Sequence, residues 1–123
     1  MVLKIIKALG DENRLRLLNL YYEDELCGCE VEAILNMTQS NVSRHLAKLT
    51  GAGITTFRKD AKYIYYRLDQ ETLKENPLIG ETIKALRKEQ LYAEDLERFR
   101  KYRTNGLSCE NIKENVLLFL GKA

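Results

Sequence analysis

The middle of the chain alternates apolar and polar residues with the period of a helix. Val42, Leu46 and Leu49 recur at intervals of four and three residues, so at about 100° per residue they share one helical face. We expect that face to be buried. The opposite face combines short polar and cationic side chains, which suit contacts with base edges and phosphates. Its residues are Ser40, Arg44, Ala47 and Lys48, flanked by Asn41 and Ser43.

A shorter apolar pattern precedes this helix. Val31, Ile34 and Leu35 predict a short helix. Thr38 is a suitable N-cap for the second helix, which we expect to begin near Gln39. Because so few residues remain for the turn, the spacing is typical of a helix-turn-helix whose second member is a recognition helix. An ordinary helical hairpin with a solvated polar face fits the same pattern.

Two strand-like segments follow the recognition helix and favour the first interpretation. Ile54–Phe57 and Tyr63–Leu68 are rich in β-branched and aromatic residues, and the basic segment Arg58–Lys62 separates them. This pattern predicts a hairpin with a basic tip, the wing of a winged helix, which could lie along a phosphate backbone.

The N-terminal segment predicts two further helices. A short apolar helix ends at Gly10, and Asp11 is a suitable N-cap for the next one. The residues expected to face the core are Leu3, Ile6 and Leu9 in the first helix and Leu15, Leu18 and Tyr22 in the second.

The C-terminal part also has a helical pattern. A polar connection holds the only proline, Pro77, and leads to one long helix predicted over 78–102. The apolar phase of this helix slips between Leu86 and Leu91, so we expect it to face two neighbours in turn. A break at 104–106 precedes a last helix with the apolar residues Ile112, Val116, Phe119 and Leu120.

These elements predict a mainly α fold with a small β-hairpin (α+β), a winged helix-turn-helix in one domain over 1–123. The C-terminal helical extension, 78–123, carries more apolar surface than a small winged core can cover. We therefore expect a homodimer joined through the terminal helices, the two-fold arrangement that reading two DNA half-sites requires.

Composition and charge agree with one DNA-binding domain. A chain of 123 residues with 45% hydrophobic content is large enough for one modest core. It has no run of about 18 apolar residues that would span a membrane, and Lys4 and Lys7 interrupt any signal-peptide pattern, so we expect a cytoplasmic protein. Between Gln39 and Arg67, six Lys or Arg face one Asp, a local +5 in a chain of +2, which leaves −3 elsewhere. The positive charge therefore concentrates on the expected DNA-contacting surface.

Two cysteines, Cys27 and Cys29, stand just before the predicted helix-turn-helix. Soft thiolates select soft ions, and a helix N-terminus stabilises a thiolate. With Asp24 as N-cap, Cys27 would lie in the first turn. Residues two apart on a helix then point roughly 200° from one another, whereas two sulfurs about 2.3 Å from one ion lie within about 4 Å of each other. We therefore expect ion binding to distort the start of this helix, made easier by Gly28, and to move the recognition helix. Alternatively, both cysteines are small buried hydrophobic residues.

Four segments together resemble the ArsR/SmtB family of metal-responsive bacterial repressors: KALGDENRLRLL, ELCGCE, TQSNVSRHLAKLTGAGI and the strand pair ending in KYIYYRL. The resemblance covers roughly residues 3–68. It implies a dimeric winged-helix repressor that leaves its operator when a toxic metal or metalloid binds. In the arsenic-sensing branch a Glu-Leu-Cys-x-Cys segment supplies thiolates to trivalent arsenic or antimony, at the positions of Cys27 and Cys29 here.

The chain departs from the family pattern in two respects. Some arsenic sensors have a third cysteine three residues after the second, where this chain has Glu32. Cys109 could supply the third thiolate from the same or the partner chain, or could have no such role. The zinc-sensing branch uses histidine on its C-terminal helix, but 78–102 contains none, which argues against a zinc site there. We expect the sole histidine, His45, to be packed or close to a phosphate rather than to bind metal.

The leading hypothesis is a DNA-binding repressor, not an enzyme, released from its operator by As(III) or Sb(III). A cadmium- or lead-responsive repressor and a thiol-redox-responsive repressor are the alternatives within this fold. A thiol-disulfide oxidoreductase is disfavoured because no βαβ pattern surrounds the thiols, and a winged helix used only for protein contacts is disfavoured by the basic wing. The expected partners are double-stranded operator DNA and a second copy of the chain, with no membrane. The expected metal ligands are Cys27, Cys29 and Cys109. The expected DNA contacts are Gln39, Ser40, Asn41, Ser43, Arg44, Lys48, Arg58, Lys59, Lys62 and Tyr63.

Overall fold

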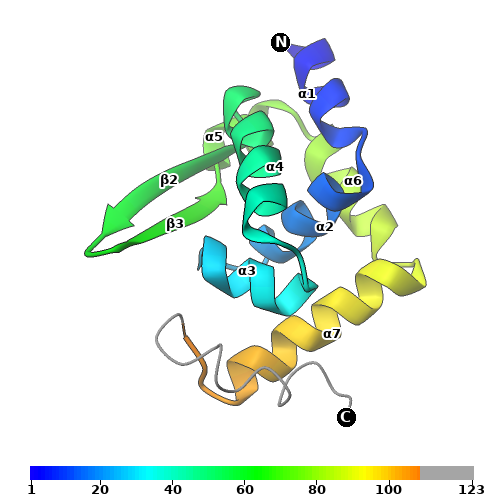
Figure 1. Cartoon of the computed structure of the whole chain (residues 1–123). Helices are drawn as coiled ribbons and strands as arrows, with labels where there is room; N and C mark the ends of the chain where they lie inside the picture. The colour runs from blue at the N-terminus through cyan, green and yellow to red at the C-terminus, as the bar shows by residue number, and fades with distance from the viewer. Residues whose placement is uncertain (109–123) are drawn as a thin grey trace.

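Seven helices and three short strands make up residues 1–108, the part of the chain that the computed structural model describes (Figure 1). The fold is mainly helical with a small antiparallel sheet, as predicted. Its elements are α1 (Val2–Leu9), α2 (Glu12–Tyr21), β1 (Leu26–Cys27), α3 (Gly28–Leu35), α4 (Gln39–Gly51), β2 (Thr55–Asp60), β3 (Tyr63–Leu68), α5 (Gln70–Glu75), α6 (Leu78–Leu86) and α7 (Gln90–Thr104).

Helices α3 and α4 form the predicted helix-turn-helix. Asn36 ends α3 in the left-handed conformation, φ 56°, which asparagine tolerates better than most residues. Thr38 then caps α4, because its hydroxyl accepts a hydrogen bond from the Asn41 N–H at 3.3 Å. The three apolar residues predicted to face the core from α4 are at most 2% exposed. The N-cap Thr38 and the buried face of α4 are therefore confirmed.

The predicted wing is present, but its tip is shorter than expected. Strands β2 and β3 pair up to Asp60 and Tyr63, so only Ala61 and Lys62 form the connection. The rest of the expected basic tip, 58–60, lies within β2. Ala61 takes a positive φ of 56°, as a tight hairpin connection requires.

A third strand, which the sequence pattern did not predict, joins the wing to the cysteine segment. Strand β1 pairs antiparallel with β3, placing Leu26 opposite Tyr66 and Cys27 opposite Tyr65. The sheet order is β1-β3-β2. Cys27 is therefore held in extended backbone at the base of the wing.

The buried faces of the first two helices differ from the prediction. In α1 the core contacts come from Ile5, Ala8 and Leu9, whereas Leu3 and Ile6 are 62% and 52% exposed. The segment VLKIIKAL is apolar on two faces, so periodicity alone selected the wrong one. The expected stripe of α2 is also incomplete: Leu18 is buried, but Leu15 and Tyr22 are only half-buried, while Leu17, Leu20 and Tyr21 are buried. Helix α2 contacts α4, α6, α7 and β3, so it buries more than one face.

The single long helix predicted over 78–102 is wrong, because the chain breaks between α6 and α7. The break falls where the apolar phase slips, so each helix faces its own neighbour: α6 packs on α2, and α7 lies across α2 and α3 (Figure 1). A short helix, α5, forms in the expected polar connection, capped by Asp69, whose carboxylate accepts the Thr72 N–H at 3.0 Å.

The exposed apolar surface, which we expected on the terminal helices as a dimer interface, is distributed differently in the structure. The apolar residues of α7, among them Leu96, Phe99 and Tyr102, pack within the same chain. In the part that the structure describes, the exposed large apolar side chains lie on α1 and the wing: Met1, Val2, Leu3, Ile6, Phe57 and Ile64. The predicted last helix and Cys109 lie outside the described residues. Over residues 1–108, no helix has the length and apolar character to cross a membrane.

Candidate effector site and nucleic-acid interface

The two sulfur atoms of the cysteine segment lie together. Cys27 has extended backbone (φ −85°, ψ 166°) and is itself the N-cap of α3, while Cys29 lies in the first turn. Their Sγ atoms are 2.8 Å apart. The prediction of Asp24 as N-cap was wrong, because pairing of β1 with β3 delays the start of the helix. Since Cys27 lies outside the helix, no unwinding is needed to bring the two sulfurs within the about 4 Å that a shared ion requires.

Cys27 and Cys29 line a cavity of about 310 Å³ between the two helices of the helix-turn-helix and the wing. Cys27 is 1% exposed and Cys29 is half-buried. Any group bound to the sulfurs would therefore have both α4 and β3 as neighbours. The remaining lining residues are Gly28 and Glu32 of α3, Gln39, Val42, Ser43 and Leu46 of α4, and Lys62, Tyr63, Ile64 and Tyr66 of the wing.

The donor set fits a thiophilic ion only in part. Two sulfurs in contact suit a soft ion shared between them. Glu32, at the position of a third cysteine in some arsenic sensors, lines the same cavity. Within residues 1–108, however, no His, Cys, Asp or Glu completes a group of three metal ligands.

A buried carboxylate, which the sequence pattern did not single out, connects the thiol segment to α7. Glu30 is 3% exposed, and its Oε1 accepts the Cys27 N–H at 2.8 Å. Its Oε2 accepts the hydroxyl of Tyr102, and the Arg103 guanidinium lies 4.0 Å away. Burial and the hydrogen bond to Glu30 both raise the pKa of Tyr102, so its hydroxyl remains a donor. The spacing of the N-cap residue and Glu30 is that of a capping box, the signal that could have identified it.

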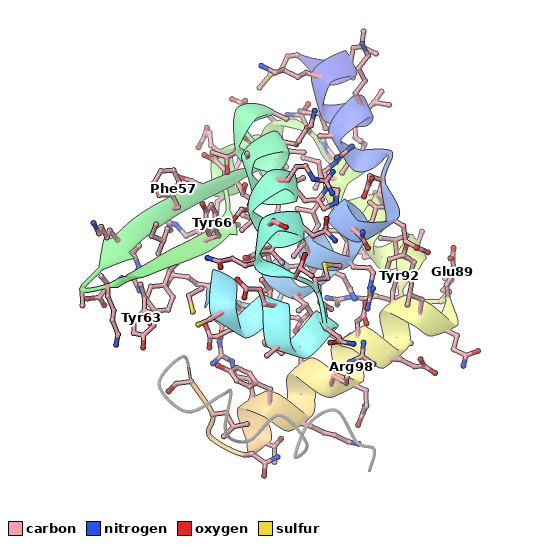
Figure 2. The ribbon with its side chains drawn as sticks, in the orientation of Figure 1. Phe57, Tyr63, Tyr66, Glu89, Tyr92 and Arg98 are labelled. Atoms are coloured by element: carbon pink, nitrogen blue, oxygen red, sulfur yellow. The ribbon has the colours of Figure 1, made fainter. Side chains whose placement is uncertain are left out.

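The other end of α3 is held by arginines. Asp95 of α7 is fully buried and pairs with Arg16 of α2 at 2.7 and 2.9 Å, and also with Arg98. Arg98 Nε in turn donates to the Ile34 carbonyl at 2.9 Å, and Figure 2 shows Arg98 reaching from α7 toward the end of α3. Helix α7 therefore holds α3 at both ends.

The predicted DNA-reading face of α4 is exposed to solvent. Gln39, Ser40 and Ser43 are exposed together with Arg44 and Lys48. Arg44 Nη2 donates to the Asn41 side-chain oxygen at 2.6 Å, which orients the guanidinium one turn from the start of the helix. The face is thus available for the contacts proposed below.

The cations of the wing are not equivalent. Arg58 donates to both carboxylate oxygens of Glu25, at 2.9 and 2.8 Å, and stacks 4.8 Å from the Tyr65 ring centroid. This hydrogen-bonded pair lowers the pKa of Glu25. Lys59 and Lys62 have no ion pair with another described residue, although the Lys62 ammonium lies 5.5 Å from the ring centroid of Tyr63, which Figure 2 labels near the wing tip. The free positive charge of the wing is therefore carried by its lysines.

His45 is packed inside the fold, as expected. It is 2% exposed, and its Nδ1 lies 3.3 Å from the Arg14 guanidinium. Because arginine only donates, Nδ1 is the acceptor in this contact. Burial is the main cause that lowers the pKa of His45, with Asp11 opposing.

The sequence is similar to known bacterial regulatory proteins. Residues 11–55 match the family described as "Bacterial regulatory protein, arsR family". The cadmium resistance transcriptional regulatory protein CadC homolog of Staphylococcus aureus is 40% identical over 75 residues, 60% of this chain and 62% of that protein. The arsenic resistance transcriptional regulator ArsR1 of Pseudomonas putida is 43% identical over 68 residues, 54% of this chain and 53% of that protein. The chain thus spans less than two thirds of these curated relatives.

Solved structures match over a larger share. The crystal structure of the transcriptional regulator HlyU from Vibrio vulnificus is similar with a TM-score of 0.59 and 34% identity, covering 71% of this chain and 84% of that one. The shared region includes most of the fold described above, so the likeness extends beyond the helix-turn-helix.

Proposed function

Because this chain belongs to the ArsR family of bacterial regulatory proteins, whose members are DNA-binding regulators and not enzymes, we propose that it is a transcriptional repressor that leaves its operator when trivalent arsenic or antimony binds Cys27 and Cys29. One observation carries this proposal: the two sulfurs lie 2.8 Å apart in a cavity walled by the recognition helix and the wing.

The thiolates select the class of effector. Thiolate sulfur prefers soft ions, and the N-terminus of α3 favours the anionic form of a thiol in its first turn. Two sulfurs leave a trigonal ion with one open position. We propose that Cys109 fills it, from the same or the partner chain, with solvent or a small thiol as the other possible occupant. Cd(II) and Pb(II) suit the same thiolates, and they are the alternative effectors.

The path from effector to DNA follows from what holds α3. Glu30 fixes the start of α3 to Tyr102, and Arg98 fixes its end through the Ile34 carbonyl. Both ends of α3 are therefore fixed to α7. An ion bound to the two sulfurs and to a third ligand would not displace α3 toward α7. The opposite walls of the cavity are α4 and β3, so the displacement passes to the recognition helix and the wing. A change in their relative position lowers affinity for operator DNA.

The DNA-binding surface combines the two elements that the effector would move. Arg44 and Lys48 of α4 contact base edges and phosphates in the major groove, with Gln39, Ser40, Asn41 and Ser43 beside them. Lys59 and Lys62 of the wing, with Arg58 and Tyr63, contact the adjacent backbone. A homodimer presents two such surfaces to two half-sites, and the exposed apolar face of α1 supplies a surface for that contact.

Oxidation of the thiol pair is a second candidate signal. The 2.8 Å separation that suits a shared ion also suits formation of a disulfide when an oxidant removes two electrons and the thiol protons. The two signals differ in their reagents, because an ion acts under reducing conditions and an oxidant acts without metal.

A titration separates these effectors. DNA that the protein itself selects from random duplexes serves as operator, labelled for fluorescence anisotropy. Under reducing conditions we expect arsenite and antimonite to release it at lower concentration than zinc does. Release by cadmium or lead alone would reassign the ion, and release by diamide but by none of the ions would reassign the signal to oxidation. Failure to select any DNA would contradict the repressor function.

A further inference from the structure

A second positively charged surface lies beside the recognition helix, on α1. Lys4 and Lys7 of α1, Arg14 of α2 and Lys48 of α4 line one cavity of about 480 Å³. The other described lining residues are Ala8, Gly51 and Ala52, so no acid within residues 1–108 lines it. Four cations around one cavity favour a polyanionic ligand.

The lysines and the arginine have different roles in this cavity. Arg14 Nε donates to the Ala8 carbonyl at 2.6 Å, its Nη2 donates to the Lys7 carbonyl at 3.4 Å, and its Nη1 contacts His45. Arg14 therefore positions the end of α1 against α4. Among the described residues, Lys4, Lys7 and Lys48 have no acidic partner, so their charges are available to a ligand.

Helix α1 divides its surface into three faces. Its buried face packs on the core through Ile5, Ala8 and Leu9. Lys4 and Lys7, three residues apart, share a second face. The exposed apolar residues Val2, Leu3 and Ile6 form the third face. A second copy of the chain that covered the apolar face would leave the lysines open.

The lysines of α1 and the wing lie on opposite flanks of α4. In Figure 1 the wing extends to one side of α4, and α1 stands on the other side. A helix in the major groove lies between two sugar-phosphate backbones. If the wing lysines contact one of these backbones, the second backbone lies on the side of α4 opposite the wing. Lys4 and Lys7 lie on that side, next to Lys48.

We propose that Lys4 and Lys7, together with Lys48, bind backbone phosphates of operator DNA on the side of α4 opposite the wing. This role rests on the proposed repressor function, because it requires α4 in the major groove. A basic amphipathic helix also suits an anionic lipid surface, but the sharing of the cavity with Lys48 of the recognition helix favours DNA.

The test compares two double variants of equal charge. Lys4→Ala/Lys7→Ala removes the proposed contacts, and Lys84→Ala/Lys101→Ala removes two exposed lysines of α6 and α7. Each phosphate contact contributes about 0.9 to the slope of log affinity against log salt concentration. We expect the first variant to flatten the slope by about two units with the preference for operator over random DNA unchanged, and the control to keep the parent slope. Lys4→Arg/Lys7→Arg should restore the slope, because arginine retains the charge.

The outcomes separate this role from the repressor function. If the parent selects operator DNA and Lys4→Ala/Lys7→Ala, folded by circular dichroism, keeps the parent slope, α1 does not contact DNA and the proposal is overturned. A parent slope combined with lost binding to vesicles containing phosphatidylserine would assign the lysines to a membrane instead. A parent that selects no DNA overturns both proposals.

Discussion

The carboxylate of Glu30 accepts a hydrogen bond from the hydroxyl of Tyr102, a residue 72 positions away in the chain. Because Glu30 also accepts the N–H of Cys27, this contact joins the first residue of the thiol site to the last long helix. The proposed effector site is therefore assembled from three parts of the sequence: the wing base, the start of α3 and α7.

Replacing Tyr102 with phenylalanine tests this connection. The variant leaves a buried carboxylate oxygen without its hydroxyl donor, which costs about 1–3 kcal/mol of unfolding free energy. Urea denaturation measures the loss. Tyr92→Phe on the same helix is the control, because the Tyr92 hydroxyl makes no hydrogen bond to another described residue and the change should cost less. Equal losses of unfolding free energy in the two variants would mean that the hydrogen bond between Tyr102 and Glu30 adds nothing measurable to stability.

The Arg44→Ala substitution tests the recognition helix. Loss of a guanidinium that reads guanine lowers affinity by about 1–3 kcal/mol and relaxes sequence preference. Lys48→Ala should weaken binding more uniformly across sequences if it contacts phosphate. Fluorescence anisotropy on operator and random duplexes measures both effects, with the exposed Arg100→Ala of α7 as control. Parent-like binding by Arg44→Ala would remove α4 from the interface.

The lysines and the arginine of the wing should contribute differently to DNA binding. Lys59→Ala/Lys62→Ala should flatten the dependence of log affinity on log salt concentration by about two units without changing sequence preference. Arg58→Ala should change the slope by less than the value of about 0.9 that one phosphate contact contributes, because Arg58 is paired with Glu25. A larger effect for Arg58→Ala than for either single lysine variant would mean that the Glu25 pair opens on DNA, and an unaltered slope in the double variant would mean that the wing does not touch DNA.

His45 gives the stability of the fold a pH dependence. Burial lowers its pKa in the folded state below the usual 6.5, so the unfolded chain takes up the proton more readily. The contribution to stability is fully present above the unfolded pKa and is lost as the pH falls below about 6.5 toward the folded value. Thermal unfolding of the parent and of His45→Gln across this range checks it: the parent should lose more stability than the variant on acidification. Parallel profiles would show that His45 does not titrate differently on folding.

The sequence predicts the helix-turn-helix well because its signals are local. The N-cap Thr38, the polar turn and the spacing of Val42, Leu46 and Leu49 act within a few residues of one another, and the structure retains all of them. The hairpin is equally local, since β2 and β3 are adjacent in the chain.

The errors fall where distant contacts decide the conformation. Pairing of Cys27 with Tyr65 keeps the cysteine extended and moves the start of α3 beyond Asp24. Two residues carry no strand period, so no pattern could reveal β1. The buried face of α1 likewise depends on neighbours that the local sequence does not identify. The slip of the apolar phase marked the place of the break between α6 and α7, but it did not show that the helix ends there.

Replacing the cysteines tests the proposed sensing mechanism directly. Cys27→Ser and Cys29→Ser should fold and bind operator, because neither thiol lies on the exposed face of α4, but arsenite should no longer release them. A coupling of about 1–3 kcal/mol between effector and DNA is sufficient for a sensor. Cys109→Ser should lower the affinity for the metalloid if Cys109 supplies the third ligand, and should leave it unchanged if solvent or a small thiol does.

The most direct measurement is therefore the arsenite-dependent fluorescence anisotropy of labelled operator with the parent chain and with Cys27→Ser/Cys29→Ser, side by side under reducing conditions. We expect both proteins to bind the metal-free operator, and only the parent to release it as arsenite is added. Release that survives the loss of both thiols would contradict the assignment of this pair as the effector site, and loss of operator binding by the metal-free variant would show that the thiols are structural.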